Sequence, residues 1–223
     1  MSRPAPDVIA VDGPAASGKG TVAQGVARAL GFNYLDSGSL YRLVALKALD
    51  ARTPLDDEGA LALAADQLQI EFAGERIRLD GVDVTAAIRT EAVSAAASRV
   101  AMLAPVRGAL LSRQRAFRRP PGLVADGRDM GTVVFPDASL KVYITASAEE
   151  RARRRYKQLI EKGNPVTIES LLRDIQERDQ RDRSRAAAPL RAAADAVILD
   201  TTGLSIDAGV AFVLERYHAL STR

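Results

Sequence analysis

Short apolar runs alternate along the chain with stretches in which apolar side chains recur at the three- to four-residue spacing of a helix. The apolar runs are typical of buried strands, and they cover residues 8–12, 32–36, 123–126, 140–144 and 196–200. Strands that alternate with helices usually form a parallel sheet with helices on its faces. The pattern therefore predicts an α/β fold built on a five-stranded parallel sheet that is flanked by helices.

Residues 66–105 depart from this alternation. The segments LQIEFAG, RIRLDG and VDVT have the length and the turn residues of short antiparallel strands, and the alanine-rich TEAVSAAASRVAMLA is typical of a helix that stops before Pro105. We expect a core domain made of residues 1–65 and 106–223, into which residues 66–105 insert a small antiparallel β lobe. Insertions in such folds commonly carry substrate specificity.

Two charged helices are predicted over residues 149–162 and 167–187, and GNPV at 163–166 joins them. The junction is consistent with the tip of a mobile lid over about residues 153–166, and equally with an ordinary turn between two helices. The pattern leaves both interpretations open.

The first predicted strand leads into DGPAASGKGT, in which four residues separate Gly13 from Gly18 and Lys19. This is the spacing of a phosphate-binding loop between a buried strand and a helix N-terminus. The two glycines permit turns that are closed to residues with a Cβ, so that consecutive N–H groups can point at a phosphate. Free N–H groups of the next helix and the charge of Lys19 strengthen the attraction. The loop predicts a bound nucleoside triphosphate; the alternative is a glycine-rich turn with a chance lysine.

One position departs from the usual loop. A Ser or Thr that binds magnesium normally follows the lysine, whereas this chain has Gly20 there and Thr21 one residue later. The magnesium hydroxyl is therefore displaced or replaced by water. Asp126, in the segment DGRD at 126–129 after the third strand, is the candidate acidic residue for the magnesium shell. The alternative for this glycine-flanked segment is plain turn chemistry.

A cluster of arginines is predicted on one face of the second charged helix. ERDQRDRSR places Arg178, Arg181, Asp182 and Arg185 at helical positions i, i+3, i+4 and i+7. A solvated helix stabilised by surface ion pairs would show the same pattern. Beside a phosphate loop, however, such a face can clamp phosphoryl oxygens and stabilise the charge of a transition state.

Other polar residues follow the predicted strands directly. Arg128 lies in DGRD, and Asp36, Ser37 and Arg42 lie in LDSGSLYR after the second strand. Ligands gather at the carboxyl ends of strands in open α/β sheets. We therefore expect these side chains on the ligand edge of the sheet.

Composition excludes several kinds of chemistry. The 223 residues have a formal net charge of +3 and include no cysteine and one histidine, so neither a disulfide framework nor a thiolate zinc site can form. We interpret His218 as structural or surface, because it is far from every motif, and a reaction that needs a histidine base is not expected. Transfer to a phosphate monoester needs no base, since its second pKa of about 6 leaves the oxygen anionic at neutral pH.

Membrane and nucleic-acid binding are not favoured. No apolar run approaches the length of a membrane span, and MSRPAPD lacks the apolar stretch of a signal peptide. Arginine far outnumbers lysine, which a GC-rich genome explains, whereas the aromatic residues that stack on bases amount to 4%. We expect a cytoplasmic protein, a monomer, that binds small nucleotides and neither membranes nor nucleic acid.

Four segments together resemble bacterial cytidylate kinases: GPAASGKGT, YLDSGSLYR, ADGRDMGTVVFPDA and ERDQRDRSRAAAPL. The match runs in order from about residue 8 to residue 202. The resemblance implies a P-loop kinase fold with an inserted monophosphate-binding lobe at 66–105 and a short lid. It also implies transfer of the γ-phosphoryl group of ATP, with Mg²⁺, to CMP or dCMP.

The resemblance further implies roles for individual residues. The donor loop would bind ATP through Gly13, Pro14, Ala15, Ala16, Ser17, Gly18, Lys19, Gly20 and Thr21, with Thr21 near magnesium directly or through water. CMP would be bound by Ser37, Ser98, Arg107 and Arg185 at the cytosine, by Asp129, Arg178 and Asp182 at the pentose, and by Arg42 and Arg128 at the phosphate. The residues expected to neutralise the transferring group are Lys19, Arg128, Arg178 and Arg181. Candidate further contacts to the donor phosphates are Arg153, Arg154 and Lys157.

Other functions stay open on the residues alone. The nearest is another P-loop small-molecule kinase that acts on uridylate, thymidylate or shikimate. A nucleotide-binding switch protein would carry a guanine-reading NKxD segment after the fourth strand, and the sequence has none. An RNA-binding protein would bind RNA tightly and with a steep salt dependence, without turnover.

Overall fold

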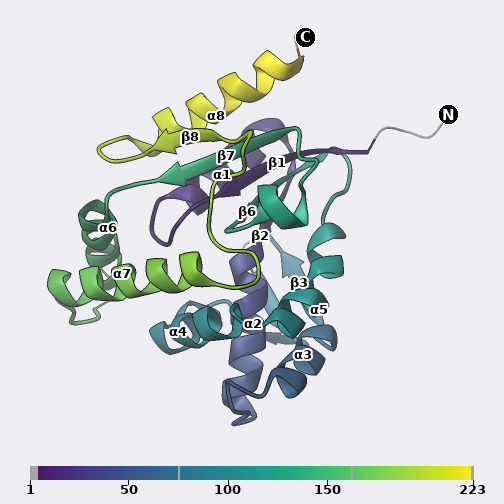
Figure 1. Ribbon diagram of the computed structural model, residues 1–223, viewed down its shortest axis with the longest axis vertical. Coiled ribbons are helices and arrows are strands. Elements are labelled where there is room, and N and C mark those ends of the chain that lie inside the picture. The colour runs from purple at the N-terminus through teal and green to yellow at the C-terminus, as the bar shows by residue number, and fades with distance from the viewer. Residues whose placement is uncertain (1–4, 75, 162, 222–223) are drawn as a thin grey trace. The chain divides into compact units, whose positions relative to one another are not determined.

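The computed structural model describes residues 5–74, 76–161 and 163–221 (Figure 1). Contacts divide them into two compact units. The first, called the core unit here, contains the residues up to Leu35 and those from Phe117 on, and the second, called the small unit, contains Asp36–Ala116. Each unit is described by itself.

The core unit is built on a five-stranded sheet of order β2-β6-β1-β7-β8. The strands are β1 (Asp7–Asp12), β2 (Asn33–Asp36), β6 (Gly122–Gly127), β7 (Leu140–Thr145) and β8 (Val197–Asp200). Both β6 and β7 run parallel to the central β1, and β8 runs parallel to β7. Parallel strands place their carboxyl ends on one edge, so the loops after β1 and β6 emerge side by side. The predicted five-stranded parallel sheet is confirmed.

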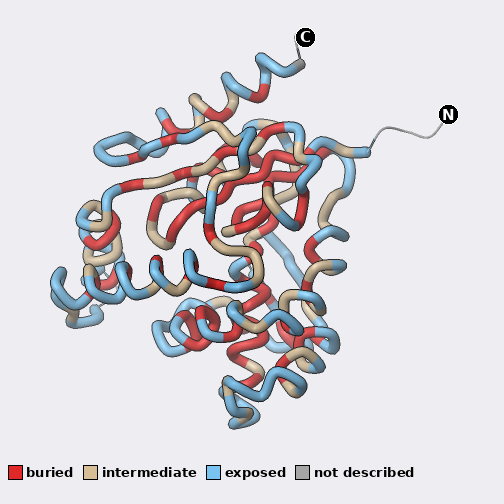
Figure 2. Tube along the Cα trace, viewed as in Figure 1, coloured by how far each residue is buried: buried red, intermediate tan, exposed pale blue. Residues whose placement is uncertain are grey.

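The helical elements of the core unit are α1 (Lys19–Leu30), the π-helical turn η2 (Met130–Val134), α6 (Ala148–Ile160), α7 (Ile168–Ser184) and α8 (Ile206–Ser221). Of these, α1, η2 and α8 pack on the sheet. Val22 and Val26 of α1 and Val213 of α8 pack on the buried strand residues Ile9 and Val142, and Figure 2 shows the central strands as buried. This apolar layer is the main core, and the phosphate loop follows the carboxyl end of β1, the central strand.

Two long charged helices pack against each other beyond β7. Ala152 and Leu159 of α6 contact Leu171 and Ile175 of α7 in a small apolar cluster (Figure 1). The remaining faces of both helices are charged, as their sequences predict. Helix α7 ends at Ser184 rather than at residue 187.

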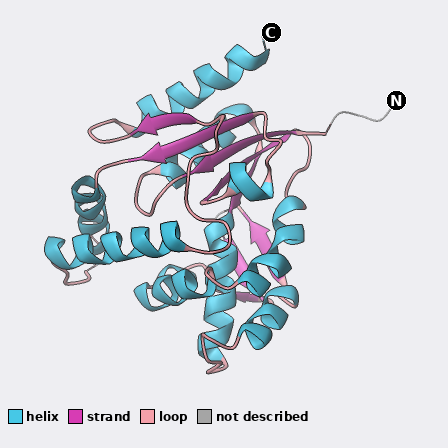
Figure 3. Ribbon diagram, viewed as in Figure 1, coloured by secondary structure: helices cyan, strands magenta, loops and turns pink. Residues whose placement is uncertain are grey.

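The small unit combines helices with a three-stranded antiparallel sheet (Figure 3). Its elements are α2 (Ser37–Asp50), α3 (Glu58–Asp66), β3 (Ile70–Ala73), β4 (Arg76–Leu79), β5 (Val82–Asp83), the 3₁₀ turn η1 (Ala87–Arg89), α4 (Glu91–Val100) and α5 (Ala104–Arg115). Helix α2 packs on α4, and α3 packs on α5. The predicted antiparallel strands are confirmed; Glu75, in the first of their turns, lies outside the described residues.

Two helix boundaries differ from the sequence-based expectation. The helix expected to continue up to Pro105 ends at Val100, and Pro105 belongs to the first turn of α5, where its missing N–H needs no partner. Helices α3 and α5 were not among the predicted elements. The small unit is longer than the predicted insertion at 66–105, because α2, α3 and α5 pack with it.

Among the described helices, none has both the length and the apolar character that crossing a membrane would demand.

A hydrogen-bonded cluster closes one end of the core unit. The Tyr217 hydroxyl donates to Asp7 Oδ2 at 2.7 Å, and the Ser139 hydroxyl donates to Asp7 Oδ1 at 2.7 Å. The hydrogen bonds from Ser139 and Tyr217 hold the pKa of Asp7 below its ordinary value. The cluster ties α8 to the beginnings of β1 and β7.

Tyr217→Phe should lower the free energy of unfolding by about 1 kcal/mol, because it removes one hydrogen bond to a carboxylate without creating a cavity. Urea denaturation at pH 7 measures the change. Tyr156→Phe is the matched control, since its hydroxyl has no hydrogen-bond partner among the described residues. Equal stability of the two variants would contradict the prediction.

Candidate active site

The loop between β1 and α1 has the geometry that phosphate binding requires. Gly18 adopts a left-handed conformation (φ 83°) just before α1, and its helix start carries no side-chain cap. A Cβ on Gly13 would collide with the carbonyl oxygen of Ile144 on β7. Both positions therefore demand glycine, and the start of α1, where helix N–H groups point outward, is a place where proteins commonly bind anions.

The structure explains why glycine follows the loop lysine. A Cβ on Gly20 would lie 2.9 Å from Asp126 Oδ2, closer than ordinary packing allows. The same Asp126 lies at the end of β6, with its Oδ1 3.5 Å from Lys19 Nζ, and it accepts a hydrogen bond from the Tyr34 hydroxyl at 3.3 Å. The carboxylate that the sequence assigns to the magnesium shell thus occupies the space that a side chain at position 20 would need.

The donor set around this carboxylate fits a magnesium ion that is bound mainly by phosphate oxygens and water. Asp126 is buried to 5% exposure at the loop, and Thr21 is exposed in the first turn of α1. No cluster of three or more acidic, histidine or cysteine side chains that could cage a metal occurs in the described part of the chain. Magnesium commonly binds through one or two protein oxygens together with substrate phosphates.

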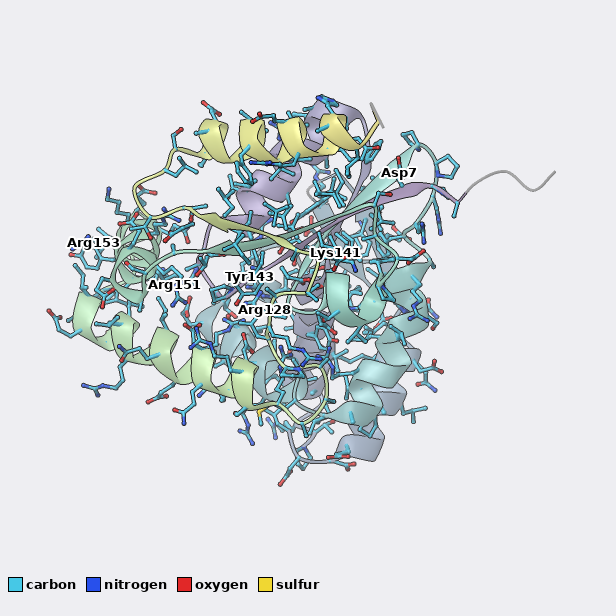
Figure 4. All side chains as sticks on the ribbon, turned by 45° about the horizontal axis from the view of Figure 1, so that its top comes forward. Asp7, Arg128, Lys141, Tyr143, Arg151 and Arg153 are labelled. Atoms are coloured by element: carbon cyan, nitrogen blue, oxygen red, sulfur yellow. The ribbon has the colours of Figure 1, made fainter. Side chains whose placement is uncertain are left out.

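Arg128 pairs with Asp182 of α7. Arg128 Nε donates to Asp182 Oδ2 at 2.9 Å, and Arg185 Nη2 lies 3.9 Å from Asp182 Oδ1. Burial raises the pKa of Asp182, but Arg128, Arg185 and Arg178 together hold it below its ordinary value. The result is a buried carboxylate surrounded by guanidinium groups. Figure 4 shows Arg128 beneath β7.

One detail of the predicted helical face is wrong. Arg185 has an extended conformation (φ −57°, ψ 131°) just after the last residue of α7, so it does not occupy a helical i+7 position. Its guanidinium is nevertheless buried, and its Nε donates to the carbonyl of Asp182 at 3.2 Å. Arg178 and Arg181 stay on the half-buried face of the helix.

Asp12 is a residue that the sequence interpretation missed. Its carboxylate ends β1 and accepts hydrogen bonds from the N–H groups of Met130 and Gly131, both at 2.8 Å. Burial raises the pKa of Asp12, and the charges of the neighbouring Asp129 and Asp126 raise it further. The two backbone hydrogen bonds lower it, but by less, so that the pKa is about 7. Asp12 thereby holds the segment that follows Arg128 and Asp129. In the sequence, only the position of Asp12 directly before the phosphate loop pointed to this role.

The side chains on α6 divide into two groups. Arg154 donates to the carbonyls of Ser17 and Thr201 and to the Thr201 hydroxyl, so it is held against the phosphate loop. Arg153 and Lys157 are exposed, and Figure 4 shows Arg153 pointing outward. Arg151 of the same helix is buried, and the sequence interpretation did not single it out.

Four of the candidate residues belong to the small unit. Ser37 begins α2, which also carries Arg42, while Ser98 lies on α4 and Arg107 on α5. The Arg107 guanidinium lies 5.6 Å from the centre of the Tyr41 ring and donates to the carbonyl of Ala101. Ser98 Oγ is buried and has no hydrogen-bond partner within the described ranges. His218 is exposed, as expected.

Comparisons with known proteins point to one family. The family model of cytidylate kinase matches residues 9–219. A cytidylate kinase of Cupriavidus necator is 59% identical over 96% of this chain and 96% of its own length, and one of Paraburkholderia phytofirmans is 59% identical over 96% and 93%. A solved structure of an uncharacterised protein from Eubacterium ventriosum aligns with a TM-score of 0.51 at 11% identity, over 95% of this chain and 98% of that one. This last similarity concerns the fold alone.

The raised pKa of Asp12 makes a prediction about stability. Because the native state binds this proton more tightly than the unfolded chain does, the contribution of Asp12 is fully present below pH 4 and is lost as the pH rises through about 7. The wild type should therefore lose up to about 4 kcal/mol relative to Asp12→Asn between pH 4 and pH 8.

Urea unfolding of both proteins across this pH range measures the difference. Asp56→Asn, at an exposed carboxylate, is the control and is measured over the same pH range. A pH-independent difference for Asp12→Asn would show that the carboxyl group titrates normally.

Proposed function

The chain belongs to the cytidylate kinase family, and we propose that it transfers the γ-phosphoryl group of ATP to CMP or dCMP, giving ADP and CDP or dCDP. The family match over residues 9–219 carries this proposal. The structural support is the juxtaposition, within one unit, of a phosphate loop and a cluster of arginines.

ATP binds through residues 13–21 in this proposal. The N–H groups of the loop and of the first turn of α1 cradle the β- and γ-phosphates, and Lys19 adds a charge that moves with the transferring group. Thr21 and Asp126 hold Mg²⁺ directly or through water. Bound there, the ion would neutralise charge on the phosphate oxygens.

The CMP contacts in this proposal are the ones that the resemblance implies. Arg42 and Arg128 hold the CMP phosphate, and the other contacts are those implied by the resemblance: Ser37, Ser98, Arg107 and Arg185 for the base, and Asp129, Arg178 and Asp182 for the pentose. Ser98 supports its assignment, because its buried hydroxyl has an unused hydrogen-bonding capacity among the described residues. Base selection then rests on buried polar groups that a wrong base would leave unpaired.

The transfer step depends on charge and position. The acceptor oxygen of a phosphate monoester is already anionic near neutral pH, so alignment of donor and acceptor replaces a general base. Lys19, Arg128, Arg178 and Arg181 stabilise the charge on the transferring group. Burial lowers the pKa of Arg128, but Asp182, Asp126 and Asp12 raise it above its ordinary value, which keeps the guanidinium charged.

Several coarser properties complete the proposal. Residues 66–105 bind the monophosphate, and residues of about 153–166 act as a lid. Lys162, within this lid, lies outside the described residues. The enzyme acts as a monomer in the cytoplasm, in pyrimidine nucleotide metabolism, and binds no nucleic acid.

Lys19→Ala and Arg128→Ala should each lower kcat for ATP and CMP by about 100-fold or more, because each removes a charge that acts on the transferring group. A coupled assay for ADP measures the rates, and circular dichroism checks that the variants remain folded. Arg28→Ala, an exposed change on the same helix as Lys19, should keep the wild-type rate. Near-normal turnover of both site variants would refute the mechanism.

The acceptor specificity is tested with a panel of CMP, dCMP, UMP, dUMP, TMP and shikimate, each with ATP. We expect kcat/KM for CMP or dCMP to exceed that for every other acceptor by at least about 100-fold, as unpaired buried polar groups penalise the wrong base. A higher kcat/KM for any other acceptor would assign the chain to a different kinase activity. Tight, salt-dependent RNA binding without turnover would exclude kinase function altogether.

A further inference from the structure

Arg151 is a buried cation that donates four hydrogen bonds to other segments of the core unit. Its side chain forms a two-pronged ion pair with Asp179 of α7, with Nη1 3.0 Å from Oδ1 and Nη2 2.6 Å from Oδ2. Its Nε donates to the carbonyl of Ala146 at 3.0 Å, and Nη1 also donates to the carbonyl of Ala15 at 3.2 Å. Arg151 is 4% exposed and Asp179 is 7% exposed.

These partners belong to segments with separate tasks. Ala15 lies inside the phosphate loop, whereas Asp179 is the neighbour of Arg178 on the helix that also carries Asp182. The planar guanidinium of Arg151 donates four hydrogen bonds. It therefore connects the donor loop with the helix that bears the arginine cluster (Figure 4). The fork of a guanidinium fixes direction as well as distance, which an ammonium group does not.

Residues of these two segments line a common open space. A cavity of about 690 Å³ is lined by Pro14 of the loop, Thr145 at the end of β7, and Gln176 and Arg183 of α7. Arg151 and Asp179 line the same cavity. At the edge of this space the ion pair gives a directional polar link between the loop backbone and α7, in addition to the apolar packing of α6 on α7 and the contact of Arg154 with the loop.

A simple gain in stability is a weaker explanation for this pair. Burying two charges is costly, and an apolar pair of similar size often stabilises a protein equally well. Apolar side chains could not hydrogen-bond the carbonyl of Ala15, however. The two carbonyl contacts are what an apolar replacement could not reproduce.

We propose that Arg151 and Asp179 are a positioning pair that sets the register between the phosphate loop and the arginines of α7 for phosphoryl transfer. This inference rests on the proposed function of the site. Neither residue touches a reacting atom; Arg151 acts through the loop backbone, and Asp179 acts by anchoring α7 next to Arg178. The pair matters most when donor and acceptor phosphates must be held at the same time.

The test compares Asp179→Asn, Arg151→Lys and the double variant Arg151→Gln/Asp179→Asn with the wild type. Arg173→Gln and Asp174→Asn, exposed changes on the same helix α7, are the matched controls. Calorimetry measures the Kd of ATP, of CMP, and of a bisubstrate probe in which five phosphates join adenosine to cytidine. Steady-state kinetics measures kcat and both KM values.

We expect kcat to fall by about 10- to 100-fold in the three pair variants, because a misplacement of about 1 Å has such an effect on a positioned reaction. The Kd of ATP alone and of CMP alone should change by less than about threefold, while that of the bisubstrate probe should rise at least tenfold. The controls should match the wild type in every measurement. A purely structural role would lower the melting temperature without changing kcat or the probe affinity of the folded protein.

Three results would overturn the inference: a kcat within twofold of the wild type in the folded double variant, an equal loss of affinity for ATP, CMP and probe, or failure of all three variants to fold. The last would assign the pair to stability alone. A wild-type protein that does not phosphorylate CMP would refute the proposed function instead, so the two failures are distinguishable.

Discussion

A guanidinium group can be buried beside a phosphate loop only when a carboxylate pairs with it, because an unpaired buried charge is very costly. Three cation–carboxylate pairs lie around the loop in the core unit: Lys19–Asp126, Arg128–Asp182 and Arg151–Asp179. Each pairs its cation with a carboxylate at low exposure, where an unpaired charge would be very costly. A phosphoryl group that enters this region meets cations whose positions are already set, which is the condition for strong electrostatic stabilisation of a transition state.

The carboxylates also explain the backbone around them. Asp126 Oδ2 lies 2.9 Å from the place that a Cβ on Gly20 would take, so a side chain after the loop lysine would require this carboxylate to shift. Asp12 accepts hydrogen bonds from the N–H groups of Met130 and Gly131 and so holds the segment that follows Arg128 and Asp129.

Residues that contact substrate in the proposed mechanism and residues that position them form distinct sets. Lys19 and Arg128 carry charge to the phosphates, whereas Asp12 and Arg151 bond mainly to backbone groups or to a buried carboxylate. The positioning residues are buried more deeply than the arginines they support. Such burial restricts their rotamers, which is how a fold holds a reactive arrangement within a fraction of an ångström.

Much of this protein follows from its sequence, because the relevant signals are local. Apolar periodicity located the five strands, and the spacing from Gly13 to Lys19 identified the phosphate loop, since both depend on neighbouring residues. The arginine face of α7 was predicted from helical spacing up to Asp182, but Arg185 leaves the helix. The break between α4 and α5 was missed, because Pro105 is compatible with a helix start as well as with an end.

Only the tertiary structure decided which charges pair. Arg151 and Asp179 are 28 residues apart, and Asp12 and Gly131 are 119 apart. Several arginines in the run at 151–155 look alike in sequence, yet Arg151 is buried and Arg153 is exposed. A charged residue becomes a positioning residue when the fold removes it from water and supplies its partners. The sequence by itself determined the elements and the phosphate loop, whereas burial and long-range pairing, which depend on the packed sheet and helices, were decided by the tertiary structure.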